Sequence, residues 1–135
     1  MKFRSIIIVS LLLSVLSCAP GANTPLKDHL LAYNWKITYA KSNNTDITSS
    51  FSPYVFNFEP NDVIIATRAD SSFTGTWYRS NSSEDNPKIV LSFGSHYQLS
   101  KLNYDWQQDE RTDNVIKFVD EMSANSTEAV TFEKF

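Results

Sequence analysis

The chain has 135 residues, a formal net charge of −3 at pH 7 and a single cysteine. This length is typical of one domain, and an acidic balance without a basic patch argues against nucleic-acid binding. Three glycines in the whole chain exclude glycine-rich phosphate-binding loops. One cysteine excludes an internal disulfide, so the domain must be stabilised by its apolar core.

The first 17 residues have the pattern of an export signal. Lys2 and Arg4 form a basic head, and residues 6–16 form an apolar run that is shorter than the about 20 residues needed to span a bilayer. The following Val15-Leu16-Ser17-Cys18 resembles the lipobox of bacterial lipoproteins. The resemblance implies cleavage after residue 17 and a diacylglyceryl thioether on Cys18. An ordinary signal peptide followed by a free cysteine is the alternative.

Residues 18–25 have the composition of a spacer between the lipidated cysteine and the folded domain. They are small, uncharged and contain Pro and Gly, which is typical of a flexible linker. A lipoprotein with two or more acyl chains is held stably at a membrane. Ala19 stands where enteric inner-membrane lipoproteins carry aspartate, and no acidic run follows. We therefore expect an outer-membrane protein at the periplasmic face.

The folded domain, residues 26–135, is predicted to begin with a short helix over residues 26–32. Leucines in this segment recur at helical spacing. Pro25 suits the first turn, and Thr24 or Asn23 suits the cap position.

After this helix the apolar residues alternate with polar ones, which is the pattern of β-strands. Polar loops are expected at residues 41–53 and 80–87, and residues 96–102 have room for one helical turn. The pattern predicts an all-β domain, an eight-stranded antiparallel up-and-down meander barrel, with an open β-sandwich as the alternative. The eight expected strands are residues 35–40, 54–58, 63–67, 73–78, 89–93, 104–109, 115–119 and 130–132.

Five short motifs resemble the lipocalin-like lipoproteins common in Bacteroidetes. They are Asn34-Trp35-Lys36-Ile37-Thr38, Tyr54-Val55-Phe56-Asn57-Phe58, Thr74-Gly75-Thr76-Trp77, Lys88-Ile89-Val90-Leu91-Ser92-Phe93, and Asp105-Trp106 before Asn114-Val115-Ile116-Lys117-Phe118. The resemblance implies a lipocalin-like barrel over residues 26–135 but no particular ligand or activity. The chain departs from true lipocalins at two places. Tyr33 stands where they have glycine, and the last strand offers Lys134 but no arginine.

Six aromatic residues are candidates for lining a ligand site at the mouth of such a barrel. An eight-stranded barrel is just wide enough to hold one small ligand or to be filled by side chains. Pockets are mostly apolar with a few placed polar groups, whereas aromatics in strands commonly pack in a core. The candidates are Trp35, Tyr54, Phe56, Trp77, Tyr104 and Trp106.

Other chemistry has little support in the sequence, and we expect no cofactor and no catalysis. His29 and His96 lack partners at metal-ligand spacing. The carboxylates of Asp105, Asp109, Glu110 and Asp113 fall near a predicted turn, where charge is usually solvated. No serine lies in a nucleophile elbow.

Three hypotheses for the function follow. The first is a non-enzymatic, membrane-tethered binding module for a small apolar or glycan-like ligand, with residues 41–53 as a lid over an open cavity. The second is a structural or protein-interaction lipoprotein of the cell envelope with a filled barrel and an exposed apolar patch. The third is a hydrolase, which requires convergent acid and base groups in a polar cleft.

Overall fold

The computed structural model describes residues 24–121 and 124–135. The predicted signal segment, Cys18 and most of the expected spacer therefore lie outside the described residues. The described part contains one α-helix, α1 (Leu26–Ala32), and two 3₁₀ helices, η1 (Thr48–Ser50) and η2 (Leu99–Leu102). Its strands are β1 (Asn34–Ser42), β2 (Thr45–Asp46), β3 (Val55–Phe58), β4 (Val63–Arg68), β5 (Ser71–Arg79), β6 (Lys88–Ser92), β7 (Asp105–Arg111), β8 (Val115–Val119) and β9 (Ala129–Lys134).

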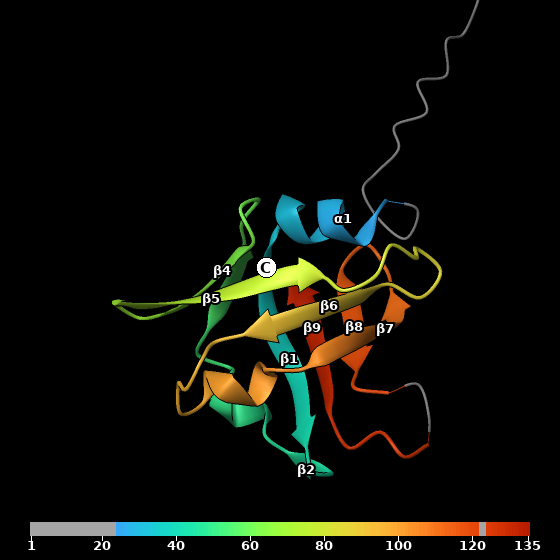
Figure 1. The fold of residues 1–135 in the computed structure, drawn as a ribbon. Coiled ribbons are helices and arrows are strands. Elements are labelled where there is room, and N and C mark those ends of the chain that lie inside the picture. The colour runs from blue at the N-terminus through green and yellow to red at the C-terminus, as the bar shows by residue number, and fades with distance from the viewer. Residues whose placement is uncertain (1–23, 122–123) are drawn as a thin grey trace, which may run out of the picture.

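Eight of these strands close into an antiparallel barrel (Figure 1). From β3 to β9 each strand pairs with the next, and β1 pairs with both β3 and β9. The β1–β9 ladder runs from Trp35 opposite Lys134 to Lys41 opposite Ala129. This ladder closes the barrel and confirms the predicted meander, because the two sheets of an open sandwich would leave these strands unpaired. The two-residue β2, which the sequence did not predict, extends β1 as a hairpin.

The inward-facing side chains fill the barrel. Along β3, β6 and β9 buried residues alternate with partly exposed ones, as the period of a strand requires. The three tryptophans are the largest fully buried side chains. Aromatic rings in the core meet edge to face, with centroids 5.6 Å apart for Phe56 and Phe132 and 5.1 Å apart for Phe58 and Trp77. Such contacts add to the free energy gained from burial.

Helix α1 covers one end of the barrel (Figure 1). Leu26 and Leu30 on its inner side are fully buried, which explains the helical spacing of the leucines. The predicted side-chain cap is not formed. Pro25 takes the cap position, without a side-chain hydrogen bond, and its carbonyl accepts the amide of His29 at 3.0 Å.

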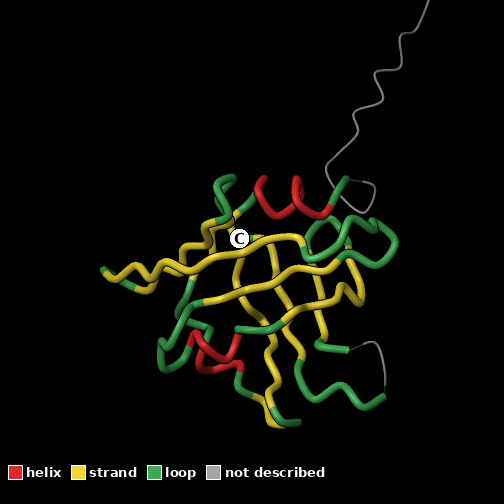
Figure 2. Tube along the Cα trace, viewed as in Figure 1, coloured by secondary structure: helices red, strands yellow, loops and turns green. Residues whose placement is uncertain are grey.

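The opposite end is covered by η1 and η2, the two short red helices at the lower left of Figure 2. Residues 41–53, expected to be an irregular lid, instead contain β2 and η1. Phe51 is fully buried in the core, and Thr48 Oγ1 accepts the backbone amide of Ala40 at 3.0 Å. This segment is therefore hydrogen-bonded to β1 and closes this end of the barrel.

Candidate functional site

Each of the three tryptophans uses its indole N–H to hold a segment at an end of the barrel. Trp35 Nε1 donates to the carbonyl of Leu30 in α1 at 3.0 Å. Trp77 Nε1 donates to Glu59 in the β3–β4 turn at 3.0 Å, and Trp106 donates to Leu102 in η2 at 2.8 Å. None of the three side chains is more than 1% exposed. Their rings contact other core side chains and offer no open face to a ligand.

The remaining candidates fall into different surroundings. Phe56 is fully buried between Phe132 and Phe93. Tyr54 is buried at the edge of a surface cleft, and Tyr104 is 37% exposed on the barrel wall. The structure therefore does not bring the six predicted residues together around one cavity, and only Tyr54 lines the cleft.

This cleft has a volume of about 360 Å³ and lies outside the barrel core. Most of its lining residues belong to the β4–β5 hairpin and to the chain that leads into η2, and Figure 1 shows these two segments away from α1. Its lining is formed by Tyr54, Arg68, Ala69, Ser71, Phe73, His96, Tyr97 and Gln98. Its volume falls in the range of small-molecule sites, whose lower end is about 300 Å³.

Aromatic rings form the apolar part of the cleft. The Phe73 and His96 rings meet edge to face with centroids 4.5 Å apart, and the Tyr54 and Phe73 centroids are 6.1 Å apart. Tyr97 is 88% exposed. A ring this exposed on a defined turn has an open face on which a planar ligand can stack.

The polar groups of the cleft are positioned by hydrogen bonds. The Tyr54 hydroxyl donates to Gln98 Oε1 at 3.1 Å. His96 Nδ1 accepts the backbone amides of Gln98 at 3.3 Å and Leu99 at 3.1 Å. These bonds make His96 the cap of the turn that enters η2 and fix the tautomer, because an accepting Nδ1 leaves the ring proton on Nε2.

The β4–β5 hairpin brings Arg68 into the lining of the cleft. Arg68 pairs with Ser71 across the two-residue turn, in which Ala69 adopts a φ of +48°. The Arg68 guanidinium carbon lies 5.8 Å from the centre of the Tyr54 ring, within the range of a cation–π contact.

The sequence pattern does not mark Arg68, Phe73, Tyr97 or Gln98 as site residues. The available signal was modest: a histidine and a tyrosine stand side by side in a segment that did not fit the strand pattern.

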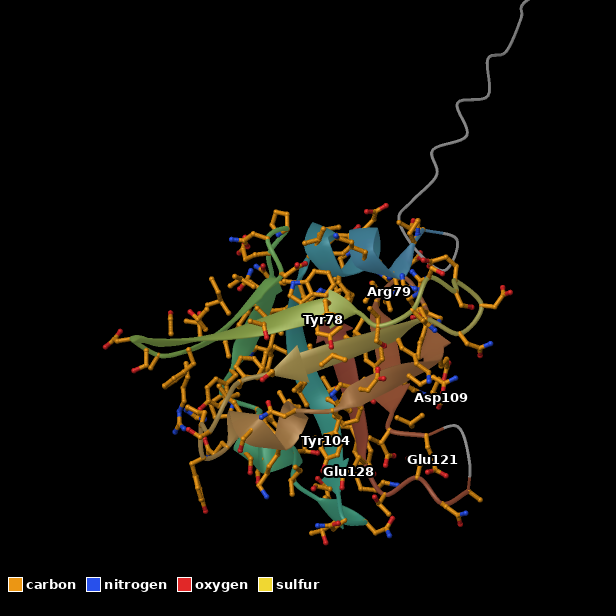
Figure 3. All side chains as sticks on the ribbon, in the orientation of Figure 1. Tyr78, Arg79, Tyr104, Asp109, Glu121 and Glu128 are labelled. Carbon is orange, nitrogen blue, oxygen red and sulfur yellow. The ribbon has the colours of Figure 1, made fainter. Side chains whose placement is uncertain are left out.

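Tyr104 belongs to a separate network on the barrel wall. Its side chain interacts with that of Glu128, and burial, followed by the charges of Glu128 and Asp120, raises the pKa of its hydroxyl. Figure 3 shows the two labelled side chains near each other, below β7. Glu128 is buried, and its Oε1 accepts the backbone amide of Asn43 at 3.0 Å. This network ties the β8–β9 connection to the β1–β2 turn.

A second buried polar cluster lies under α1. His29 is fully buried, its Nε2 lies 3.1 Å from the carbonyl oxygen of Asp113, and its Nδ1 lies 3.4 Å from Arg111 Nη1. His29 is therefore neutral, donating from Nε2 and accepting at Nδ1. Burial lowers the pKa of His29, and the charge of Arg111 acts in the same direction.

Arg111 and Glu84 join this end of the barrel to the chain around α1. Arg111 Nη1 donates to the carbonyl of Thr24 at 2.6 Å. Glu84 bonds Arg79 Nη1 at 2.7 Å and the backbone amide of Leu26 at 3.2 Å. The hydrogen bond from Arg79 lowers the pKa of Glu84. These contacts, like those of His29 and Asp113, attach α1 to the barrel.

A hollow of about 410 Å³ lies on the outer wall formed by β7, β8, β9 and β1. Tyr39, which is 40% exposed, borders it. The rest of its lining is Asp109, Lys117, Phe118, Val119, Ala129 and Thr131.

Of the carboxylates considered for hydrolysis, Asp109 lines the hollow on the outer wall together with Lys117, but among the described residues no second carboxyl group lines that hollow, and none of the four lines the aromatic cleft. Asp105 accepts the Ser80 hydroxyl at 2.7 Å, and Glu110 pairs with Lys117 at 2.8 Å. Within residues 24–121 and 124–135, no three His, Cys, Asp or Glu side chains form a group that could hold a metal ion. In the same part of the chain, no helix is long and apolar enough to cross a bilayer.

The fold and the cleft define the class of protein: a closed eight-stranded antiparallel barrel, filled by side chains, with an aromatic cleft outside the core at one end. No family model, curated protein or solved structure matches the chain.

Proposed function

We propose that this chain is a lipocalin-like lipoprotein, tethered to a membrane through Cys18, that binds a small apolar or glycan-like ligand without transforming it. The observation that carries the proposal is the cleft of about 360 Å³ lined by Tyr54, Phe73, His96 and Tyr97. Aromatic side chains beside a few fixed polar groups are the usual composition of a small-molecule site. Because side chains fill the barrel, the proposed ligand site is this cleft and not the mouth of the barrel.

The positions of α1 and of the cleft suggest how the tethered protein would be oriented at a membrane. The described chain starts beside α1, and Figure 1 shows α1 away from the β4–β5 hairpin and the chain leading into η2, which line the cleft. A lipid on Cys18, six residues before Thr24, would then leave the cleft facing away from the membrane. Binding without catalysis is favoured because the lining of the cleft contains no carboxylate that could act with His96 as an acid–base pair.

Ligand binding is tested by NMR titration of the ¹⁵N-labelled protein with monocyclic aromatic compounds and monosaccharides. We expect shift changes at residues 54, 68–73 and 96–98. Tyr97→Ala should weaken binding several-fold, because it removes the most exposed ring. Tyr78→Ala is the matched control, since Tyr78 is also exposed but lies outside the cleft. Absence of shifts with every compound, or equal effects of the two variants, would contradict the proposal.

The lipid anchor is tested separately. Mass spectrometry of the protein from bacterial membranes should show Cys18 as an N-terminal residue carrying a diacylglyceryl group. Cys18→Ser should release the protein from the membrane fraction. A mature protein with an unmodified thiol would favour the ordinary signal peptide.

A protein-interaction lipoprotein is the second candidate, and the hollow beside Tyr39 favours it. Tyrosine at a concave, partly apolar surface is a common anchor of protein interfaces. A photo-crosslinking residue at position 39 should then capture a specific envelope protein in cells. The same residue at Lys27, exposed on α1, is the control.

A further inference from the structure

The charge of the cleft differs from that of the whole chain. The chain has 15 acidic and 12 basic residues, yet among the cleft residues the only formal charge is that of Arg68, and no carboxylate lines it. A hollow whose one formal charge is positive attracts anions locally, although the protein as a whole carries a net negative charge.

Arg68 is held near the cleft without a carboxylate partner among residues 24–121 and 124–135. No salt bridge within 4.0 Å involves it there, including one to Asp70 in the same hairpin. Its guanidinium instead lies over the Tyr54 ring. A guanidinium that lies over a ring contacts it through its flat face, which leaves the N–H groups in its plane able to bind a carboxylate in a bidentate manner.

The other polar groups add donors. His96 Nδ1 accepts two backbone amides, so its Nε2–H is the atom able to bond a ligand. Gln98 Oε1 accepts the Tyr54 hydroxyl, so the free end of this amide is its NH₂ group. Arg68, His96 and Gln98 thus present donors around rings that can stack on a planar or ring-shaped body.

We propose that the cleft binds a small ring compound bearing a carboxylate, with the ring against Tyr97 and Phe73 and the carboxylate on Arg68. This inference rests on the proposed ligand-binding function and specifies its ligand class. Aromatic acids and sugar acids share this chemistry, and separate probes distinguish them.

The test is titration calorimetry of the full chain with four probes: benzoate, its neutral isostere benzamide, glucuronate and neutral glucose. We expect at least one acid to bind about tenfold more tightly than its neutral partner, which corresponds to about 1.4 kcal/mol and is modest for a charge-assisted hydrogen bond. Arg68→Gln should abolish the difference, and Arg68→Lys should keep part of it. Lys27→Gln, the same charge change on α1, should leave it intact.

The outcomes separate the two proposals. Benzoate without glucuronate assigns aromatic acids, glucuronate without benzoate assigns sugar acids, and both binding supports the shared chemistry. If neutral and acidic probes bind equally, or if Arg68→Gln retains the preference, the carboxylate inference is overturned and the binding cleft stands. If none of the four binds, the carboxylate inference fails; NMR mapping with the wider panel then decides the proposed function itself.

Discussion

Lys134 holds its Nζ 3.8 Å from the centre of the Tyr33 ring. These are the two positions at which the chain departs from the lipocalin pattern, and in the fold they form one contact. Tyr33 meets Trp35 edge to face at 6.2 Å, and Lys134 is the register partner of Trp35. A tyrosine and a lysine thus occupy the surroundings of the first tryptophan, where the pattern has a glycine and an arginine.

This contact predicts measurable coupling between the two side chains. Lys134→Met should destabilise the protein by about 0.5–1 kcal/mol in the wild type, as expected for a partly exposed cation–π pair. In a Tyr33→Leu background the same substitution should cost close to nothing. Urea denaturation of the four proteins of this double-mutant cycle measures the coupling. Equal costs in both backgrounds would show that the two residues do not interact.

His29 predicts a loss of stability on mild acidification. Burial lowers its pKa from the ordinary value of 6.5 in the folded protein. The unfolded chain therefore binds the proton first as pH falls below about 6.5, and the free energy of unfolding declines until the folded pKa is passed. Denaturation at pH 7.5 and 5.5 should show this decline, and His29→Gln should flatten it.

His96→Gln is the control for this effect, since His96 lies at the other end of the barrel. The ordinary pKa values of carboxyl groups lie below that of histidine. The pKa of Glu84 is lowered from 4.5, first by its hydrogen bond to Arg79, so its contribution is lost only as pH falls below about 4.5. A decline between pH 7.5 and 5.5 that persists in His29→Gln would assign the effect elsewhere.

The fold was predictable because strand positions depend on local alternation. Inward positions such as Trp35, Ile37 and Phe132 are apolar and their neighbours along the strand are polar, and period-two alternation of this kind located all eight barrel strands. The polar β2 carries no such signal, because neither of its residues is buried. It forms through the turn at Asn43 and Asn44, whose φ values of +50° and +61° are ones that asparagine tolerates.

The cleft was not predictable in the same way. Tyr54, Arg68 and His96 belong to three distant segments, which only the closed barrel and its hairpin bring together. Sequence pattern also cannot separate a ring that fills a core from one that lines a site. Trp77 and Tyr97 are equally good stacking surfaces by type, and they differ in that one is 1% and the other 88% exposed.

Gly75 is predicted to be intolerant of any side chain. A Cβ at this position would lie 2.5 Å from the carbonyl oxygen of Ser92 and 2.7 Å from Phe93 Cδ1. Gly75→Ala should therefore cost about 1–3 kcal/mol through overpacking, measured by urea denaturation. Thr74→Ala, exposed on the same strand, should change stability by no more than about 0.5 kcal/mol. A stable Gly75→Ala protein would mean that β5 and β6 can separate without cost.

Trp106 links core packing to the cleft. Its indole N–H is bonded to Leu102 in η2, and the segment entering η2 carries His96, Tyr97 and Gln98. Trp106→Phe leaves the Leu102 carbonyl without this donor and opens a small void, which together should cost about 2–4 kcal/mol. Because the bond holds η2 against the barrel, hydrogen exchange at residues 96–102 should also accelerate relative to β8 and β9. Tyr97→Phe, which changes an exposed side chain, should do neither. Uniform acceleration across all strands would instead show that Trp106 stabilises the barrel as a whole and has no specific hold on the segment that forms the cleft.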